Sequence, residues 1–122
     1  MNTVNLYREE ILEHYQEPHN FGKLEKADSH SRQSNPLCGD DIEMFVKFKN
    51  GVIGNVRFEG RGCAICMAGA SMLTEYALGK SKAQLTKFSE NDMLKMLGIK
   101  VSETRRKCAM LALAVLKDCL YV

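Results

Sequence analysis

The sequence predicts an α+β domain in which helices pack on one face of a small antiparallel β-sheet of about three strands. The order of segments carries this prediction, because two alternating segments, 41–49 and 52–59, precede most of the helical segments. A chain of 122 residues, 45% of them hydrophobic, is long enough to bury one core. We therefore expect residues 1–122 to form a single domain.

The segment before the sheet predicts one helix and a weakly indicated strand. Asn5 to Gln16 carries apolar residues near helical spacing, and Pro18 and Gly22 end the helix. The residues expected on its apolar face are Leu6, Ile11, Leu12 and Tyr15. Residues 23–36 are polar, and only 25–30 gives a weak strand signal.

A β-hairpin is the firmest structural prediction. Both segments alternate in polarity, with Phe45 as the exception, and Asn50-Gly51 between them suits a type I′ turn. The positions expected to share the inner face are Ile42, Met44, Val46 and Phe48 in the first strand and Val52, Gly54, Val56 and Phe58 in the second.

The remainder of the chain predicts four helices. Residues 64–78 are apolar nearly all round, which predicts a buried central helix that ends at Gly79. Two short helices are expected at 81–87 and 89–97, and a last helix runs from about 102 to 120. An apolar stripe along this last helix consists of Cys108, Leu111, Ala112, Val115, Leu116 and Cys119.

Composition excludes several classes of function. The formal net charge is only +2 and the basic residues are scattered, so we expect no nucleic-acid partner. No apolar run reaches membrane-spanning length, and residues 1–15 lack the apolar region of a signal peptide, so we expect a cytoplasmic protein without a membrane partner. Five cysteines should then stay reduced, which leaves metal binding, sulfur chemistry or core packing for them.

Three cysteines and one carboxylate are candidate metal ligands. Cys38 lies in a Pro/Gly loop with Asp40 two residues on, Cys63 lies at a Gly-rich strand-to-helix turn, and Cys108 lies near the start of the last helix. If the fold brings them together, they would suit iron or zinc. Each also has a structural reading: Cys63 and Cys108 could pack in the core, and Asp40 could simply begin a strand as a solvated carboxylate.

The remaining candidates are weaker. Cys119 lies about 16 Å along the helix from Cys108 and is assigned to the core. Cys66 forms a lone C-x-x-C with Cys63, which is a weak signal for zinc or for thioredoxin-type chemistry. The histidines, which are His14, His19 and His30, have no ligand partner at helical or turn spacing.

Spaced motifs run in order along nearly the whole chain. They are Tyr7, His14-Tyr15, Pro18, Asn20 and Gly22; Cys38-Gly39-Asp40; Gly60-Arg61-Gly62-Cys63; Ala68-Gly69-Ala70-Ser71; and Lys107-Cys108-Ala109. Together they resemble the U-type iron–sulfur cluster assembly scaffolds, a family that includes IscU, SufU and the N-terminal part of NifU. The resemblance implies that Cys38, Asp40, Cys63 and Cys108 gather at one exposed end of an α+β domain.

The resemblance also implies a function. A labile [2Fe–2S] cluster would be assembled on these four ligands from iron and from persulfide sulfur supplied by a cysteine desulfurase, then passed to acceptor or carrier proteins. Cys38 or Cys108 would accept the persulfide sulfur. The protein would then be a scaffold rather than an enzyme.

Two departures from the IscU pattern bear on partners and metal. Residues 101–105 replace the IscU motif for an Hsp70-type chaperone, which speaks against that partner. Lys107 stands where IscU-type members have His, and it would act as a cation that tunes the thiolates. Lys before the last cysteine is similar to SufU, although the SufU insertion before that cysteine is lacking here. The alternative function is therefore a zinc-bound sulfurtransferase that uses the same four ligands.

Overall fold

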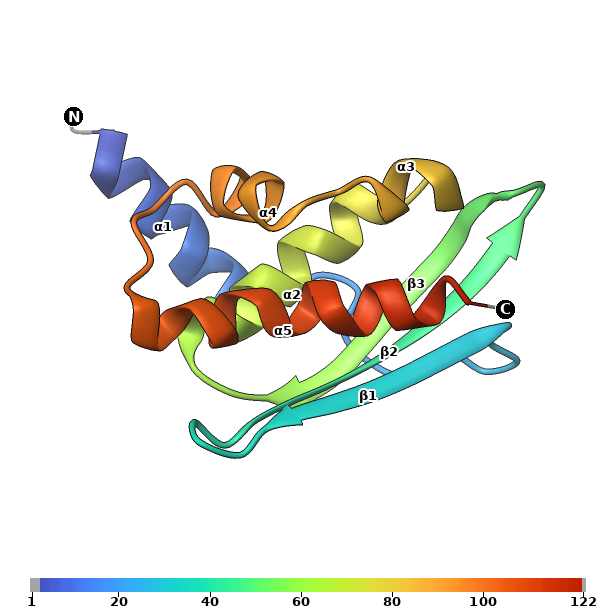
Figure 1. Ribbon diagram of the computed structural model, residues 1–122, viewed down its shortest axis with the longest axis horizontal. Helices are drawn as coiled ribbons and strands as arrows, with labels where there is room; N and C mark the ends of the chain where they lie inside the picture. Colours follow the sequence, from blue (N-terminus) through green and yellow to red (C-terminus); the bar gives the residue numbers. More distant parts are fainter. Residues whose placement is uncertain (1–2, 122) are drawn as a thin grey trace.

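The computed structural model describes the backbone of residues 3–121 and the side chains of residues 9–121. One antiparallel sheet runs in the order β1-β2-β3, with the strands at Ser29–Asn35, Asp40–Lys49 and Val52–Arg61. The helices of this part of the chain are α1 (Thr3–Gln16), α2 (Ala64–Ala77), α3 (Lys82–Thr86), α4 (Glu90–Leu97) and α5 (Glu103–Cys119). The helices gather on one face of the sheet (Figure 1), so the predicted α+β class is confirmed.

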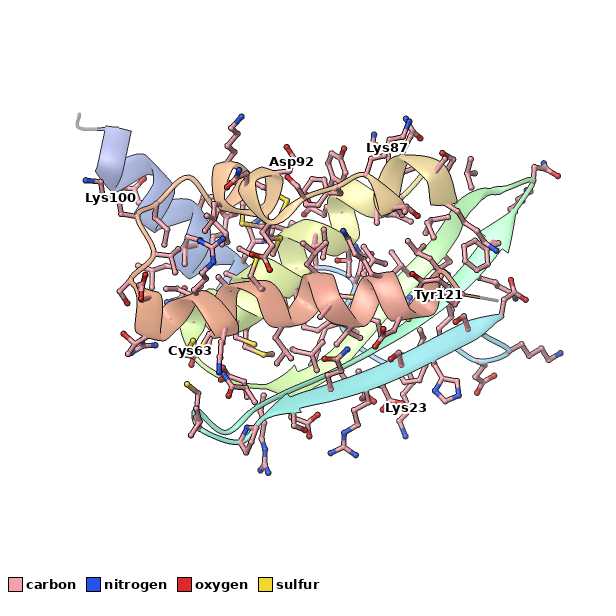
Figure 2. All side chains as sticks on the ribbon, in the orientation of Figure 1. Lys23, Cys63, Lys87, Asp92, Lys100 and Tyr121 are labelled. Carbon is pink, nitrogen blue, oxygen red and sulfur yellow. The ribbon has the colours of Figure 1, made fainter. Side chains whose placement is uncertain are left out.

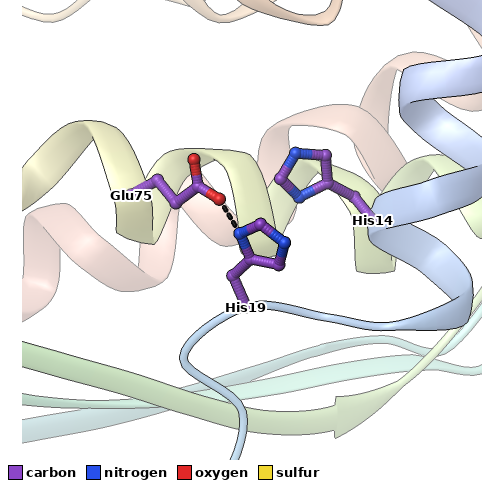
Figure 3. Close-up of side chains that lie close together, drawn as sticks. All are labelled: His14, His19 and Glu75. Carbon is purple, nitrogen blue, oxygen red and sulfur yellow. Dashed lines mark ion pairs between the residues drawn. The ribbon is translucent and has the colours of Figure 1, made fainter.

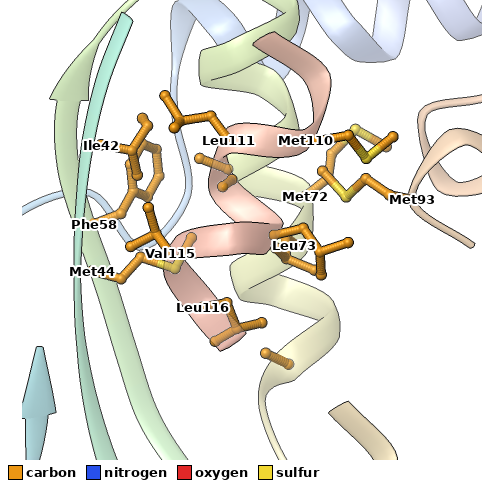
Figure 4. Close-up of a cluster of buried hydrophobic side chains, with 14 of the residues drawn as sticks. Ile42, Met44, Phe58, Met72, Leu73, Met93, Met110, Leu111, Val115 and Leu116 are labelled. Atoms are coloured by element: carbon orange, nitrogen blue, oxygen red, sulfur yellow. The ribbon is translucent and has the colours of Figure 1, made fainter. Parts of the chain in front are cut away.

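The core lies between the sheet and its two longest covering helices. Helix α5 packs against β1 and β2, and α2 packs against β3 and against α1. Ile42, Met44 and Phe58 point from the sheet toward Leu73 of α2 and Val115 of α5 (Figure 4), and all five are fully buried. The packing of α2 and α5 on the sheet therefore fixes where the N-terminal ends of these two helices lie relative to the strands.

The hairpin is confirmed, with one correction to its second strand. Asn50 and Gly51 both have positive φ, 53° and 81°, as a type I′ turn requires. The pairing register shifts between Lys47 and Phe48, which leaves Gly54 as an extra residue in β3. Ile53 is buried instead of Gly54 as a result, so the alternation predicted for the start of this strand was wrong.

The first strand lies later in the chain than the sequence indicates. The weak signal at 25–30 was displaced, because β1 occupies Ser29–Asn35. Its side chains alternate between half-buried and exposed, since β1 is an edge strand with only one face under α5. A polar edge strand of this kind has no hydrophobic alternation, so its position cannot be predicted from the sequence pattern.

Helix α1 buries a different face from the one predicted. Ile11 is buried as expected, but Leu12 and Tyr15 are 51% and 43% exposed, whereas His14 is only 7% exposed. The reason is a polar contact, because His14 Nδ1 lies 2.7 Å from Ser71 Oγ on α2. The predicted contribution of Leu6 lies outside the described side chains.

The helix ends follow their capping residues. Ser89 and Asp92 form a reciprocal capping box at the start of α4. Gly79, just after α2, has a φ of 81°. None of the helices within residues 3–121 combines the length and the apolar character needed to cross a membrane.

Candidate metal centre

Three of the four predicted ligands converge at one end of the domain. Cys38 lies in the β1–β2 loop, Asp40 begins β2, and Cys108 lies in the second turn of α5. One ligand atom from each of these residues lies within 4.8 Å of the other two. Cys63, labelled in Figure 2, is the N-cap of α2 and donates its N–H to Asp40 Oδ1, but it is not part of the 4.8 Å set. We call Cys38, Asp40, Cys63 and Cys108 the sulfur site.

Asp40 is the least expected feature of the sulfur site in physical terms. Its side chain points inward on the same face of β2 as Ile42, and the residue is only 1% exposed. Its Oδ1 accepts the backbone N–H of Cys63 at 3.1 Å, but its buried Oδ2 has no partner among the described residues. A buried carboxylate oxygen without a partner costs free energy, so its position indicates a ligand that is added later.

Two glycines allow this approach of β2 to the start of α2. A Cβ at Gly62 would lie 2.6 Å from Asp40 Oδ1 and 3.1 Å from Cys66 Sγ. A Cβ at Gly60 would lie 2.0 Å from the carbonyl oxygen of Asp41. The Gly-x-Gly-Cys motif is therefore a steric requirement for placing the Asp40 carboxylate next to Cys63.

Cys38 is held by a tight turn and is exposed. The backbone N–H groups of Cys38 and Gly39 both donate to the carbonyl oxygen of Asn35, at 3.2 and 2.9 Å. The side chain of Asn35 is 8% exposed, and its Nδ2 has no partner among the described residues. Sequence reasoning missed Asn35, whose only signal was its place before Pro36 in the cysteine loop.

Cys108 and Cys66 are buried thiols. Burial raises the pKa of the Cys108 thiol, and the neighbouring Asp40 and Cys38 side chains raise it further. Burial likewise raises the pKa of Cys66, with a smaller contribution from the charge of Asp40. Without a cation, the low-dielectric setting therefore keeps Cys108 protonated, and a metal ion would have to displace that proton. Cys66 and Cys119 are fully buried and pack in the core.

An open cavity of about 670 Å³ lies over the sulfur site. Cys38 and Cys63 line it together with Asn35 and with the exposed Leu37. Its other wall is the first part of α5, formed by Glu103, Thr104, Arg105 and Lys107. Lys107 therefore borders the same cavity as the two accessible cysteines.

A second group of possible ligands was missed in the sequence. His14 of α1, His19 of the following loop and Glu75 of α2 each offer a ligand atom within 4.8 Å of the others. The sequence offers no ligand partner for His14 and His19 at helical or turn spacing, and the structure brings one from elsewhere. This third residue comes from a helix far along the chain. Burial lowers the pKa of His14, and the neighbouring His19 lowers it further.

The fold and the sulfur site define an α+β domain with thiols and a carboxylate, a candidate metal centre, gathered at one end. Residues 6–121 match the NifU-like N terminal domain family, and this chain belongs to that family.

Two similar proteins have different names, one as an iron-sulfur cluster assembly scaffold and the other as a zinc-dependent sulfurtransferase. The chain is 36% identical over 93 residues to iron-sulfur cluster assembly scaffold protein IscU 1 of Archaeoglobus fulgidus, covering 76% of this chain and 61% of the relative. It is 40% identical over 79 residues to zinc-dependent sulfurtransferase SufU of Bacillus subtilis, covering 65% of this chain and 53% of that protein. The chain thus spans less than two thirds of the length of these relatives.

A solved structure shares the whole fold. The putative iron-sulfur cluster assembly scaffold protein for the SUF system from Fervidobacterium islandicum superposes with a TM-score of 0.82 at 27% identity. The match covers 98% of this chain and 99% of the other.

Proposed function

We propose that this protein is a scaffold on which a [2Fe–2S] cluster is assembled and from which the cluster passes to acceptor proteins. The observation that carries the proposal is the convergence of Cys38, Asp40 and Cys108 around a buried carboxylate oxygen that has no partner among the described residues. Family membership and the names of the relatives support it. The cluster is cargo here, and an open site that includes a hard carboxylate suits an iron–sulfur group that must later leave.

The ligands would be Cys38, Asp40, Cys63 and Cys108. This donor set fits iron or zinc, because soft sulfur atoms and one carboxylate oxygen lie within 4.8 Å of one another. Cys63 is half-buried at the N-terminus of α2, and its backbone N–H already donates to Asp40 Oδ1 at 3.1 Å.

Sulfur would arrive as a persulfide on a cysteine desulfurase. A thiolate of this protein attacks the outer sulfur, the S–S bond of the donor breaks, and the donor cysteine leaves as a thiolate. Cys38 is the better first acceptor, since it is exposed, whereas Cys108 is buried and held as a thiol. Reduction of each transferred sulfur to sulfide then needs two electrons from an external thiol or electron-transfer protein.

Anaerobic reconstitution with Fe²⁺ and sulfide tests the proposal. We expect a visible iron–sulfur chromophore that weakens in Cys38→Ala, Cys63→Ala and Cys108→Ala. Cys119→Ala is the matched control, because Cys119 lies on the same helix as Cys108 but packs in the core, and it should keep the chromophore. If the wild-type protein holds no cluster under these conditions, the scaffold proposal is wrong.

A second candidate function is a zinc-bound sulfurtransferase. Lys107 directly before Cys108, and the 40% identity to a protein named as a zinc-dependent sulfurtransferase, favour it. The same four residues would hold Zn²⁺, which would keep bound thiols deprotonated and ready to accept sulfur. Stoichiometric zinc in protein purified without added iron, together with stimulation of a desulfurase and no cluster, would favour this function over the scaffold.

A further inference from the structure

His14, His19 and Glu75, which we call the histidine cluster, come from three separate parts of the fold (Figure 3). His14 projects from α1, His19 from the loop after it, and Glu75 from the last turn of α2. His19 Nδ1 contacts Glu75 Oε1, and the rings of His14 and His19 lie 4.5 Å apart between centroids. Two imidazoles and one carboxylate thus face one another at the surface.

The backbone of His19 is fixed even though its side chain is exposed. Its N–H donates to Ser71 Oγ at 2.8 Å, and the side chain of Asn20 donates to Thr74 Oγ1 at 3.2 Å. The same loop pairs with β3, because the N–H of Phe58 donates to the carbonyl oxygen of Asn20 at 2.9 Å. The loop therefore holds His19 beside α2 without help from a ligand.

Ser71 also orients His14. The buried hydroxyl of Ser71 lies 2.7 Å from His14 Nδ1 and already accepts the N–H of His19. When Nδ1 donates its proton to this oxygen, Nε2 carries the lone pair. Metal-binding histidines use this arrangement, in which one ring nitrogen is tied to a fixed partner and the other binds the ion.

There is space for an ion with its remaining water ligands. His14 and Glu75 line an open cavity of about 310 Å³ together with Glu10, which lies one helical turn before His14. The carboxylates of Glu10 and Glu75 make this region attractive to a cation. Binding at the usual distances of about 2.0–2.2 Å would draw the ligand atoms to within roughly 3.5 Å of one another. His19 and Glu75 can make that movement, since their side chains are 47% and 44% exposed.

We propose that His14, His19 and Glu75 form a second binding site for a divalent transition-metal ion of the zinc class, separate from the sulfur site. Two imidazoles and one carboxylate suit Zn²⁺ and similar ions and include no sulfur. Glu75 lies 12 residues after Cys63, a helical rise of roughly 18 Å, so one ion cannot serve both sites. A bound ion would fasten the loop after α1 to α2.

Titration of the metal-free full chain with Co²⁺ and Zn²⁺ tests this site. Cobalt bound to thiolates gives strong near-ultraviolet charge-transfer absorption, whereas cobalt bound to imidazole and carboxylate gives only weak visible bands. We expect wild-type protein to bind two equivalents, one of each kind. His19→Ala and Glu75→Gln should weaken the sulfur-free equivalent at least tenfold and leave the thiolate absorption unchanged.

The matched control is His30→Ala. His30 is the third histidine of the chain and faces Glu43 at 3.7 Å on the sheet, without a third ligand of the kind found in the histidine cluster. This variant should bind both equivalents like the wild type. The proposal is overturned if the wild type binds no sulfur-free equivalent, or if that equivalent survives in both His19→Ala and Glu75→Gln. Equal loss in His30→Ala would overturn it as well, because binding would then be non-specific.

Discussion

The sulfur site and the histidine cluster differ in how far their polar atoms are already paired. At the sulfur site, Asp40 Oδ2 and Asn35 Nδ2 are buried without partners in the described part of the chain. In the histidine cluster, His14 pairs with Ser71 and His19 pairs with Glu75. Unpaired buried atoms make the sulfur site incomplete without a ligand, whereas the histidine cluster is stable without one and should bind metal more weakly.

Removal of a sulfur ligand should have the largest effect. Cys108→Ala should weaken metal binding at the sulfur site by more than about 100-fold, because loss of a direct ligand exceeds the 10–100-fold cost of changing an outer partner. Binding of the second metal ion, at the histidine cluster, should be unaffected. Metal titration of Cys108→Ala, with Cys119→Ala as the control, checks this. Equal weakening of both sites would break the distinction between them.

Replacing the buried Asp40 carboxylate with a neutral side chain should change the stability of the metal-free protein and the metal affinity of the sulfur site in opposite directions. Asp40→Asn keeps an acceptor for the Cys63 N–H but removes an unpaired buried charge. The metal-free protein should therefore gain unfolding free energy, because a buried neutral amide without a partner costs less than a buried charge without one, while the affinity of the sulfur site falls. Urea unfolding with and without Zn²⁺ measures both changes. A variant that is less stable without metal would show that Asp40 is paired in solution.

The orienting hydroxyl should matter only for the histidine cluster. Ser71→Ala removes the partner of His14 Nδ1, and we expect the sulfur-free equivalent to bind about 10–100-fold more weakly. Cobalt absorption from the thiolates should not change. Retention of full affinity at both sites would mean that Ser71 supports the fold without orienting a ligand. Circular dichroism of the variant confirms that α1 and α2 remain folded.

The buried thiols and His14 should make the protein lose stability at opposite ends of the pH scale. Cys108, Cys66 and Cys119 have raised pKa values in the folded protein, so their contribution is present below the unfolded value of 9.0 and is lost as the pH rises above it. His14 has a lowered pKa, so its contribution is present above 6.5 and is lost as the pH falls. Metal-free protein should thus be most stable between these values.

Thermal unfolding from pH 5 to 10 measures this profile. Cys119→Ala should flatten the alkaline decline and His14→Gln the acid one, each by a small amount. A melting temperature that keeps rising above pH 9 would contradict the assignment of these cysteines as buried thiols.

The sequence was most informative where a turn needs particular residues or where apolar residues recur at a regular period. The hairpin followed from Asn50-Gly51 and clear alternation, and the Cys-Gly-Asp motif placed Cys38 and Asp40 together. β1 was misplaced because a polar edge strand has no apolar period. No pattern in the sequence indicates the extra residue at Gly54 that shifts the pairing register. The burial of His14 depends on Ser71, 57 positions away, so no local pattern could indicate it.

The central claim is that the sulfur site carries an iron–sulfur cluster, and its most direct test is metal and sulfide analysis of protein isolated anaerobically from cells that naturally make it. We predict iron and acid-labile sulfide in equal amounts, both lost in Cys108→Ala and kept in Cys119→Ala. Protein that contains neither iron nor sulfide, or that keeps both in Cys108→Ala, would contradict the claim.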